Sequence, residues 1–573
     1  MSAASGPYLG PETGEMLGPA DLADLERRAL EYSAGAVTQA FPVVTEHGTP
    51  PWRPAEIPSE RTLGEERGLR EGDSRGRRGG GLGAVPGSGL AARGSGAVDR
   101  AAGGRGAALL PSPPDSVRGV HIPAASLRSS WTPAFVLILT LVGIGWSVRH
   151  ILSTEQVIEG HPSQLSFLWS FVFISLVWHI GLAWTERPFK TSARQQKYVD
   201  SLELWVNIPT YNEQPQIVRT VFTAAFRQER MPQHIHVVDD GTSTYDYAAI
   251  GLVGEFYALA REHPEVDARW ITKPNGGKRS AQMISFRMVP RSVPGREHII
   301  ATLDSDSVKE YRANAEGLKP FARKDVMSVA AVILAYNCKA SILTRLTDPW
   351  LMAFQLCVRS ALSRLGSVLV NSGNLSYYRG DAILNALDCY ENELFMNREV
   401  QFSDDSLLTL LAYLQGKTVQ QSSSFAFTVL PENIRHHVNQ QLRWMRGSTI
   451  RSIWRFRYLP VFSFAYWEHF ASWWNFAMVS VAFGDLFIYG PAVQHKEIPV
   501  LFQFSALVAY ATALKYLTIR RSDQSFWYQL GTFLLSPVML IWTALILRPL
   551  RVYAMATCWK TGWGTRGDVE VEI

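Results

Sequence analysis

The stretch His-Ile-Ile-Ala-Thr-Leu-Asp-Ser-Asp-Ser, residues 298–307, decides the fold. A short apolar run ends there in two carboxylates, Asp304 and Asp306, one residue apart. This pattern is typical of a buried strand of a parallel sheet that delivers acidic side chains to its C-terminal edge, where the ligands of open α/β sheets bind. Two oxygen donors at that edge can hold Mg²⁺ or Mn²⁺. Taken alone, the stretch also fits a strand followed by an acidic turn, because Asp-x-Asp is a short and common motif.

Two further apolar runs end in polar residues in the same way. Residues 202–208 and 234–238 are each followed by a helical pattern, which is the βαβ rhythm of a parallel sheet. Because parallel strands end at one edge, the polar residues after all three runs are expected to lie together. After the first two runs these residues are Pro209, Tyr211 and Glu213, then Asp239 and Asp240. The sequence therefore predicts a ligand site at one edge of an α/β domain.

Composition varies along the 573 residues and limits the class of protein. Residues 1–130 are rich in Gly, Arg, Ala, Ser and Pro and poor in large apolar side chains, so this tail is expected to be disordered. The formal charge of +5 is small and the basic residues are scattered, which argues against a nucleic-acid partner. The four cysteines show no paired or metal-ligand spacing, as is typical of reduced thiols in a protein that faces the cytosol.

Apolar runs flank the α/β region on both sides and predict membrane spans. Two runs precede the region and three follow it, and each is close to the ~20 residues that cross a bilayer. The α/β domain is therefore expected to be inserted between transmembrane helices of a multi-pass membrane protein. The five runs are residues 131–148, 165–184, 466–489, 499–519 and 526–547.

The basic residues predict the orientation of these spans. Four Lys and Arg residues lie between positions 187 and 197, and Arg520 and Arg521 lie between the fourth and fifth spans. The positive-inside rule then places the N-terminus and the α/β domain in the cytoplasm. A shorter apolar run, 550–558, follows. If it stays out of the bilayer the C-terminus lies outside, and if it returns as a sixth, short or re-entrant segment the C-terminus is cytoplasmic.

Taken in order, the motifs resemble those of processive family-2 glycosyltransferases. The Q-x-x-R-W signature of cellulose, chitin and hyaluronan synthases stands at 440–444, and the W-G-T motif of hyaluronan synthases, to which the likeness is greatest, stands at 563–565. The resemblance covers roughly residues 131–567 and implies a Rossmann-like domain of GT-A type. It also implies that the run at 550–558 returns through the membrane as a sixth segment, either short or broken at Pro549.

The predicted chain then has six parts. These are a disordered tail (1–130), two transmembrane helices (131–186), the cytosolic GT-A domain (187–445), an interfacial helix (446–465), C-terminal transmembrane helices, three clear and a fourth short or re-entrant (466–558), and a cytosolic tail with the Trp-Gly-Thr-Arg motif (559–573).

The resemblance also implies which residues act. The diphosphate leaving group of a UDP-sugar needs a cation and positive side chains. Asp304 and Asp306 are implied to hold Mg²⁺ or Mn²⁺, and Asp405, supported by Asp404, is implied to be the general base for the acceptor hydroxyl. The implied nucleotide-sugar contacts are Pro209, Tyr211, Glu213, Asp239, Asp240, Lys278, Asp304, Gln440, Arg443, Trp563 and Arg566. The implied acceptor contacts are Trp444, Ser372, Gly373, Tyr378 and Arg379.

Structural alternatives stand beside several of these roles. Asp404 and Asp405 also suit the start of a helix, and Lys278 also suits a solvated turn. An Arg-Trp pair on a basic helix before a span is commonly an interfacial anchor. In the third span, Glu468 and Asn475 are candidates to line a polar path for the polymer, with a headgroup position as the alternative for Glu468.

The resemblance implies a plasma-membrane enzyme that transfers sugars from UDP-sugars to a growing polysaccharide and secretes it. Hyaluronan, made from UDP-N-acetylglucosamine and UDP-glucuronate, is the expected product. The alternatives are a chitin- or cellulose-type polymer, a non-processive lipid glycosyltransferase, or a transporter or scaffold with a dead transferase domain. The last predicts broken acidic motifs, whereas every expected carboxylate is present. Departures from the family pattern at Asn374, Ser376, Ser403, Ser406 and Met445 lie around the sugars and bear on the product.

Overall fold

A computed structural model of the chain describes residues 122–128, single positions between 138 and 149, and residues 164–484 and 498–562. Most of the predicted tail 1–130 and of the predicted span 131–148 lies outside the described residues. The same holds for Trp563 and Arg566.

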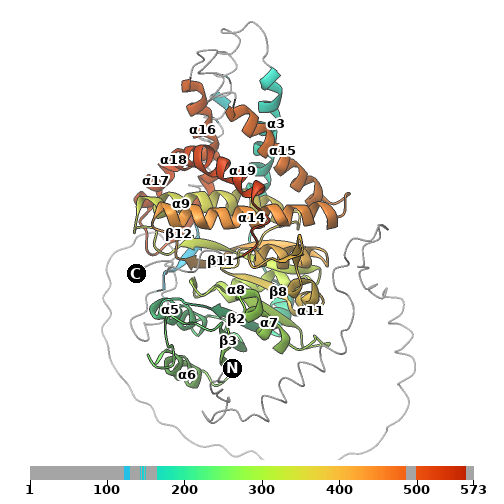
Figure 1. The fold of residues 1–573 in the computed structure, drawn as a ribbon, viewed down its shortest axis with the longest axis vertical. Helices are drawn as coiled ribbons and strands as arrows, with labels where there is room; N and C mark the ends of the chain where they lie inside the picture. Colours follow the sequence, from blue (N-terminus) through green and yellow to red (C-terminus); the bar gives the residue numbers. More distant parts are fainter. Residues whose placement is uncertain are drawn as a thin grey trace, which may run out of the picture. The chain divides into compact units, whose positions relative to one another are not determined.

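The centre of the fold is an eight-stranded mixed sheet in the order β4-β3-β2-β5-β8-β7-β11-β6 (Figure 1). Strands β4, β3, β2 and β5 are mutually parallel, as are β7 and β11, and β8 runs antiparallel between β5 and β7. The predicted α/β class is confirmed. The strands are β2 (Glu203–Thr210), β3 (His234–Asp239), β4 (Asp267–Thr272), β5 (His298–Thr302), β6 (Ser307–Lys309), β7 (Val326–Ala335), β8 (Ser376–Arg379) and β11 (Lys417–Thr428).

Three of these strands correspond to the three predicted runs, but β4 was not predicted. It lies at the edge of the sheet and none of its residues is buried. An edge strand needs no continuous apolar run, and Asp-Ala-Arg-Trp-Ile-Thr has none. The stretch 298–307 is therefore not the third strand of the sheet in chain order but the fourth, β5.

Alternate side chains of the central strands pack into two cores on opposite faces of the sheet. In β2, Leu204, Val206 and Ile208 join the larger core, and Trp205 joins the smaller one. Helices α5 (Pro215–Ala225) and α6 (Leu252–Glu262) contribute to the larger core. Helices α7 (Lys278–Met288) and α13 (Asp404–Tyr413) contribute to the smaller one. A sheet covered on both faces can offer a ligand only its edges, and the strand ends become the place for a site.

Helices α9 (Ile342–Ala353) and α14 (Ile434–Tyr458) lie between the sheet and a group of apolar helices (Figure 1). Helix α9 contacts β7 and α18, and α14 contacts α13, α15 and α19. Because α14 runs through residue 445, the predicted boundary between catalytic domain and interfacial helix divides one helix. The apolar helices are α3 (Gln164–Thr185), α15 (Phe464–Gly484), α16 (Ile498–Ala513), α17 (Phe526–Leu534), α18 (Ser536–Trp542) and α19 (Arg548–Ala556).

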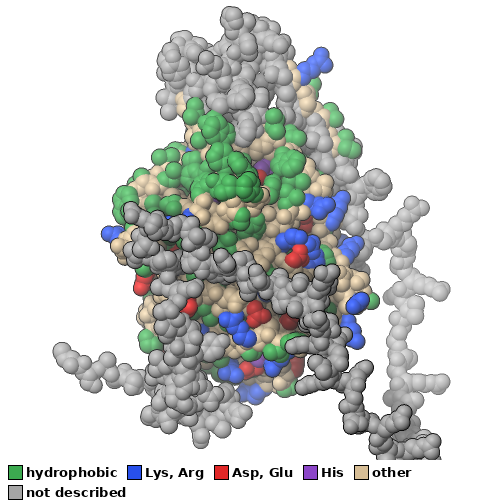
Figure 2. Space-filling view, turned by 90° about the vertical axis from the view of Figure 1, so that its right-hand side faces the viewer, with side chains coloured by type: hydrophobic (Ala, Val, Ile, Leu, Met, Phe, Trp, Pro, Cys, Tyr) green, Lys and Arg blue, Asp and Glu red, His purple; other side chains and the backbone are tan. Residues whose placement is uncertain are grey.

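The apolar helices expose large hydrophobic side chains. Trp178, Trp467 and Trp527 are 52%, 54% and 77% exposed. On the face shown in Figure 2, hydrophobic side chains gather in one region, with most charged side chains outside it. Among the described residues, one helix, Phe526–Ala556, has 31 residues and contains an 18-residue stretch with a mean hydropathy of 2.1, so it is long and apolar enough to cross a membrane by length and composition.

The same helix corrects the prediction for the run at 550–558. This run continues the helix that starts at Phe526 instead of forming a separate segment. Pro549 lies in the first turn of α19, directly after a π-helical turn (Thr543–Leu547), where a missing N–H is tolerated. The predicted break at Pro549 is therefore wrong.

The end of the predicted tail is also ordered. Strand β1 (Ala125–Leu127) pairs with β12 (Ile519–Arg521), which lies between α16 and α17. Ile122 and Ala125 are buried in the larger core, so these residues gain enough apolar burial to order. The remaining elements are α4 (Ala193–Asp200), α8 (Ala313–Gly317), a 3₁₀ turn (Lys319–Ala322), a π-helical turn (Phe354–Arg359), α10 (Ser360–Arg364), α11 (Gly380–Leu384), α12 (Leu387–Glu391), β9 (Leu394–Phe395), β10 (Arg398–Glu399) and a second 3₁₀ turn (Leu514–Thr518).

Candidate active site

The loops that follow β2, β3 and β4 are tied together. Asn212, which has a left-handed backbone (φ 50°), accepts hydrogen bonds from two backbone N–H groups of the loop after β3. Asp240 accepts from two backbone N–H groups of the loop after β4, at 3.0 and 2.7 Å. A Cβ on Gly241 (φ 72°) would stand 2.7 Å from the backbone N of Asn275, so only glycine fits there. The three loops form one braced edge, which positions the start of α7.

The predicted nucleotide contacts of β2 and β3 lie at this edge. Pro209 is buried near the end of β2, Tyr211 is partly exposed just after it, and Glu213 is buried. Asp239 accepts hydrogen bonds from the N–H and the hydroxyl of Thr242 at 3.0 and 2.6 Å. Burial raises the pKa of Asp239 above its ordinary value. The register of β2 with β3 and β5 confirms that the polar ends of all three predicted runs meet.

Lys278, the first residue of α7, lies at the centre of the acidic residues. Its Nζ is 2.7 Å from Oδ1 of Asp304, just beyond β5, and 3.9 Å from Oδ2 of Asp404, in the first turn of α13. Burial by itself would lower the pKa of Lys278, but Asp304, Asp404 and then Asp405 raise it above its ordinary value. Lys278 is therefore a charged group that faces an excess of carboxylates.

Asp404 and Asp405 are neighbours with different surroundings. Asp404 is 3% exposed, and its carboxylate faces Lys278 and Nε of Arg279, the latter at 3.5 Å. Asp405 is partly exposed and accepts hydrogen bonds from the N–H of the next residue at 2.7 Å and of Gly373 at 3.2 Å. Burial, opposed by Lys278 and reinforced by Asp404, raises the pKa of Asp405 to about 6. A partly exposed carboxylate with a pKa near neutrality suits a general base.

A buried ion-pair network that sequence reasoning missed supports these acids. Glu393, 2% exposed, accepts hydrogen bonds from Arg279 of α7 at 3.0 Å and from Arg451 of α14 at 2.6 and 3.1 Å. Arg451 also donates to the hydroxyl of Ser406 at 3.1 Å. The network joins α7, α13 and α14 behind Asp404. No motif signals it, since 114 residues separate Arg279 from Glu393.

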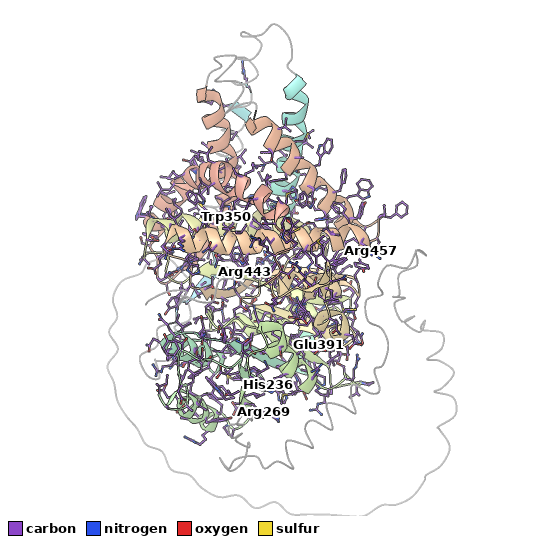
Figure 3. All side chains as sticks on the ribbon, viewed as in Figure 1. His236, Arg269, Trp350, Glu391, Arg443 and Arg457 are labelled. Atoms are coloured by element: carbon purple, nitrogen blue, oxygen red, sulfur yellow. The ribbon has the colours of Figure 1, made fainter. Side chains whose placement is uncertain are left out.

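Helix α14 carries the Q-x-x-R-W motif beside the start of α13. A Cβ on Gly447 would stand 2.6 Å from the Cβ of Ser403, so the two helices touch at this point. Trp444 is one turn earlier on the same face and is 42% exposed. Gln440 is partly exposed, and so is Arg443, which lies between the sheet and the apolar helices (Figure 3).

Gly373 brings the loop 371–374 close to Asp304, Asp404 and Asp405, which together with Lys278 we call the acidic cluster. A Cβ there would stand 3.1 Å from Oδ2 of Asp304 and 3.3 Å from Nζ of Lys278. A side chain at this position would press against the ion pair of Asp304 with Lys278. Ser372 precedes Gly373 in the same loop.

Arg379 is not brought to the cluster, whereas Tyr378 lies close enough to Asp405 that, after burial, the charge of this carboxylate also raises the pKa of its phenol. Both lie in β8, which runs antiparallel to β5, so each residue after Ser376 is further from the ligand edge. Tyr378 is fully buried, and Arg379 pairs in register with Ile299 near the start of β5. The guanidinium of Arg379 donates to the carboxylate of Glu297 and to three backbone carbonyls. The prediction of Arg379 as an acceptor contact is therefore wrong, because strand direction carries it away from the ligand edge, and Tyr378 stays a predicted acceptor contact.

The carboxylates at the edge fit a divalent cation. Three of them act on the single ammonium of Lys278, which leaves negative charge to be compensated. Asp304 is 25% exposed in its side chain, and Asp306, two residues on, is also partly exposed. Mg²⁺ and Mn²⁺ prefer such oxygen donors. Asp304 and Asp306 are the residues that would hold the ion.

A second group with metal-ligand chemistry lies at the opposite end of the strands. His234 and His236 of β3 and Asp267 of β4 place one ligand atom each within 4.8 Å of one another. Asp267 already accepts hydrogen bonds from Arg269. Figure 3 shows His236 and Arg269 far along the domain from Arg443. Since His234 begins β3 whereas Asp239 ends it, this group lies apart from the acidic cluster.

The comparisons with known proteins identify a matching family model and several relatives of this chain. Residues 203–447 match the family model described as "Glycosyltransferase like family 2". The chain is 31% identical over 405 residues to the hyaluronan synthase of Streptococcus pyogenes, which is 69% of this chain and 89% of that protein. It is 30% identical over 261 residues to an N-acetylglucosaminyltransferase of Sinorhizobium fredii, which is 44% of this chain and 59% of that protein.

Among solved structures, the chain is similar to the mannosyltransferase PcManGT from Pyrobaculum calidifontis, solved in complex with GDP-Man and Mn²⁺. The identity is 17% and the TM-score 0.43, covering 67% of this chain and 98% of that one. This likeness is too low to carry an argument. The fold assignment rests on the strand order of the chain itself and on the family match.

Proposed function

Since the chain belongs to glycosyltransferase family 2 and is an enzyme homologous to hyaluronan synthases, we propose that it elongates a polysaccharide from UDP-sugars and secretes it. Hyaluronan, made from UDP-N-acetylglucosamine and UDP-glucuronate, is the proposed product. The observation that carries this proposal is the convergence of Asp304, Asp404 and Asp405 on Lys278 at the ligand edge of the sheet. The match to the streptococcal enzyme over 89% of its length supports the choice of donors.

In the proposed reaction, Asp405 accepts the proton of the acceptor hydroxyl as that oxygen attacks the anomeric carbon. The bond from this carbon to the diphosphate breaks, UDP leaves, and the configuration at the anomeric carbon is inverted. Lys278 and Arg443 supply positive charge toward the diphosphate. A divalent cation on Asp304 and Asp306 would neutralise the charge of the departing group. Asp404, whose carboxylate faces Lys278 and Arg279, keeps both cations in place.

The remaining residues are proposed to bind the substrates. Trp444 offers an exposed aromatic face on which a sugar can stack, and Ser372 and Gly373 border the acceptor. Trp563 and Arg566, outside the described residues, stay proposed nucleotide contacts. The other proposed nucleotide contacts are Pro209, Tyr211, Glu213, Asp239, Asp240 and Gln440.

We place the catalytic domain in the cytoplasm and the apolar helices in the plasma membrane as a multi-pass bundle. Their exposed tryptophans and valines support this placement, since such surfaces need lipid. Polar pairs join α3 to α15: His179 with Glu468 at 2.6 Å and Ser175 with Asn475 at 2.8 Å. Polar groups inside apolar helices are candidates for a polymer path.

A single-donor product is the second candidate. The similarity to an N-acetylglucosaminyltransferase supports UDP-N-acetylglucosamine as sole donor of a chitin-type chain. The cellulose-type product and the lipid glycosyltransferase have no comparable support.

Product analysis tests the proposal. The protein in lipid nanodiscs is given Mg²⁺ and each UDP-sugar, alone and in pairs, and UDP release and polymer size are measured. We expect a long polymer, degraded by hyaluronidase, only with UDP-N-acetylglucosamine and UDP-glucuronate together. Polymer from UDP-N-acetylglucosamine alone would mean that the product is a chitin-type chain made by the same proposed reaction. No turnover with any donor, equal to that of an Asp405→Asn variant, would overturn the proposal.

A further inference from the structure

The loop 371–374 is hydrogen-bonded to Asp405, the proposed base, and through Ser307 to Asp306, a proposed metal ligand. The N–H of Gly373 donates to Oδ2 of Asp405 at 3.2 Å. The side-chain amide of Asn374 donates to the hydroxyl of Ser307 at 2.9 Å, and this hydroxyl donates to Oδ1 of Asp306 at 3.0 Å. One short loop is therefore bonded to the proposed base directly and to a proposed metal ligand through one hydroxyl.

Asn374 holds the side of the loop that faces Asp306 and the proposed site of the sugar donor. Besides Ser307 at the start of β6, its amide nitrogen donates to the hydroxyl of Thr428 at the end of β11, also at 2.9 Å. Ser307 and Thr428 face each other in the antiparallel pairing of β6 with β11. Both amide hydrogens of Asn374 are therefore used to hold the loop against two strands at the sheet edge, beside Asp306.

Arg359 holds the loop from the other side. It ends the π-helical turn Phe354–Arg359 and is 1% exposed. Its Nη1 donates to the hydroxyl of Ser372 at 3.3 Å, and its other donors bond the carbonyl of Ala331 and the side chains of Gln355 and Gln420. The π-helical turn is itself a local irregularity of a kind that occurs often at functional sites.

The partners of Arg359 are all neutral. Within the described residues its hydrogen bonds go to a backbone carbonyl, a serine hydroxyl and two glutamine side chains. Burial lowers the pKa of Arg359 to about 9, and the negative charge of Asp405 opposes that lowering. A buried guanidinium without a paired acid is costly, so its presence points to positioning rather than to stability.

We propose that Arg359 and Asn374 are positioning residues that hold loop 371–374 between the donor carboxylates and Asp405. The inference rests on the proposed function. Neither side chain touches the reacting atoms. Both act through the loop, which sets the distance between the acceptor side and the donor side of the reaction. Loosening the loop on either side therefore slows transfer more than it weakens donor binding.

Steady-state kinetics of three variants test this inference. Asn374→Ala removes both donor-side bonds, Ser372→Ala removes the hydroxyl that Arg359 bonds, and Arg359→Lys keeps the charge but loses the planar donors. The matched control is Asn337→Ala, whose amide nitrogen likewise donates two hydrogen bonds, to the carbonyl of Leu430 and the carboxylate of Glu432, and none to loop 371–374. Each protein is assayed in nanodiscs with Mg²⁺ and both UDP-sugars for kcat, donor KM and thermal midpoint.

We expect kcat to fall about 10- to 100-fold in Asn374→Ala, Ser372→Ala and Arg359→Lys, because misplacement of about 1 Å has effects of this size. Donor KM is expected to change less than about threefold, and Asn337→Ala to keep the kcat of the wild type. A double variant that combines Asn374→Ala with Ser372→Ala should lose less than the product of the two single losses, since both side chains hold one loop.

Two results would overturn the inference alone. One is a kcat within about twofold of the wild type in both loop variants. The other is a loss of kcat that merely follows the thermal midpoint, the control included. Wild-type turnover by Asp405→Asn would overturn the proposed function and this inference with it.

Discussion

The two ends of the same parallel strands carry side chains of similar chemistry and have opposite characters. At the C-terminal ends, Asp304 and Asp405 are partly exposed and share a lysine. At the N-terminal ends, His234 and His236 lie beside Asp267, and Trp205 of β2 stacks on His234 with ring centroids 3.4 Å apart. Both ends carry residue types that bind metals in other proteins. The acidic end is partly exposed to solvent, whereas the histidine end is packed against Trp205.

The difference shows that the chemical type of a residue predicts a functional site less well than the charge and hydrogen-bonding capacity that its neighbours leave uncompensated. At the histidine end, Ser285 lies 3.0 Å from Nδ1 of His236, and Asp267 is bonded by Arg269 and His234. Burial lowers the pKa of His236 to about 3, so it is neutral and serves as packing. At the acidic end, carboxylates exceed cations. The predictions below test whether catalysis belongs to one end alone.

The largest expected effect is that of Asp405→Asn. Removing a general base costs about 10²- to 10⁴-fold in kcat. The matched change at the other end, Asp267→Asn, is expected to leave kcat within about twofold. In the wild type, kcat/KM should fall as pH drops through about 6, because the base becomes protonated. Equal losses in both variants, measured by UDP release, would erase the distinction between the two ends.

The metal requirement should follow the acidic end. After chelation, we expect turnover to return with Mg²⁺ or Mn²⁺ in the wild type and to return poorly in Asp306→Asn. His234→Ala should respond like the wild type, since Asp267 already accepts hydrogen bonds from Arg269. Metal titrations of turnover give the apparent affinity for each protein. A shifted affinity in His234→Ala with none in Asp306→Asn would reverse the assignment.

Gly373→Ala should have an intermediate effect. The added methyl would stand 3.1 Å from Asp304 and 3.3 Å from Lys278, in the space where the donor is proposed to bind. Donor KM is expected to rise about tenfold, which corresponds to about 1.4 kcal/mol. Gly254→Ala, whose Cβ meets nothing within 4 Å, is the control. Unchanged donor KM in Gly373→Ala would show that this space is not part of the donor site.

The smallest effect on activity is expected at the histidine end. His236 has a folded-state pKa of about 3, below the ~6.5 of an unfolded histidine, so its contribution is complete above pH ~6.5 and is lost as pH falls toward 3. From pH 6.5 to 5 this loss is about 2 kcal/mol.

The substitution that tests this is His236→Asn. The variant should show a smaller drop in thermal midpoint between pH 7 and pH 5 than the wild type, with turnover at pH 7.5 unchanged. An identical acid sensitivity in both proteins would mean that another group controls it.

The comparison also explains which features could be read from the chain. Strand ends are local, so Asp239, Asp304 and Glu213 were placed correctly from apolar runs and the residues after them. Edge strand β4 and the break expected at Pro549 were misjudged, because an edge needs no apolar run and a π-helical turn precedes the proline. Arg379 was misplaced because a motif does not reveal strand direction.

By itself, then, the sequence determined the α/β class, the ligand edge and the acids that stand at it. Periodicity and the order of strand and polar end are properties of neighbouring residues. Three sets of contacts became visible only in the folded chain. Lys278 faces Asp304 and Asp404, and Glu393 joins Arg279 to Arg451. Arg359 and Asn374 hold one loop. These contacts link residues from 13 to more than a hundred positions apart. They are set by helix packing against the sheet, which no local pattern encodes.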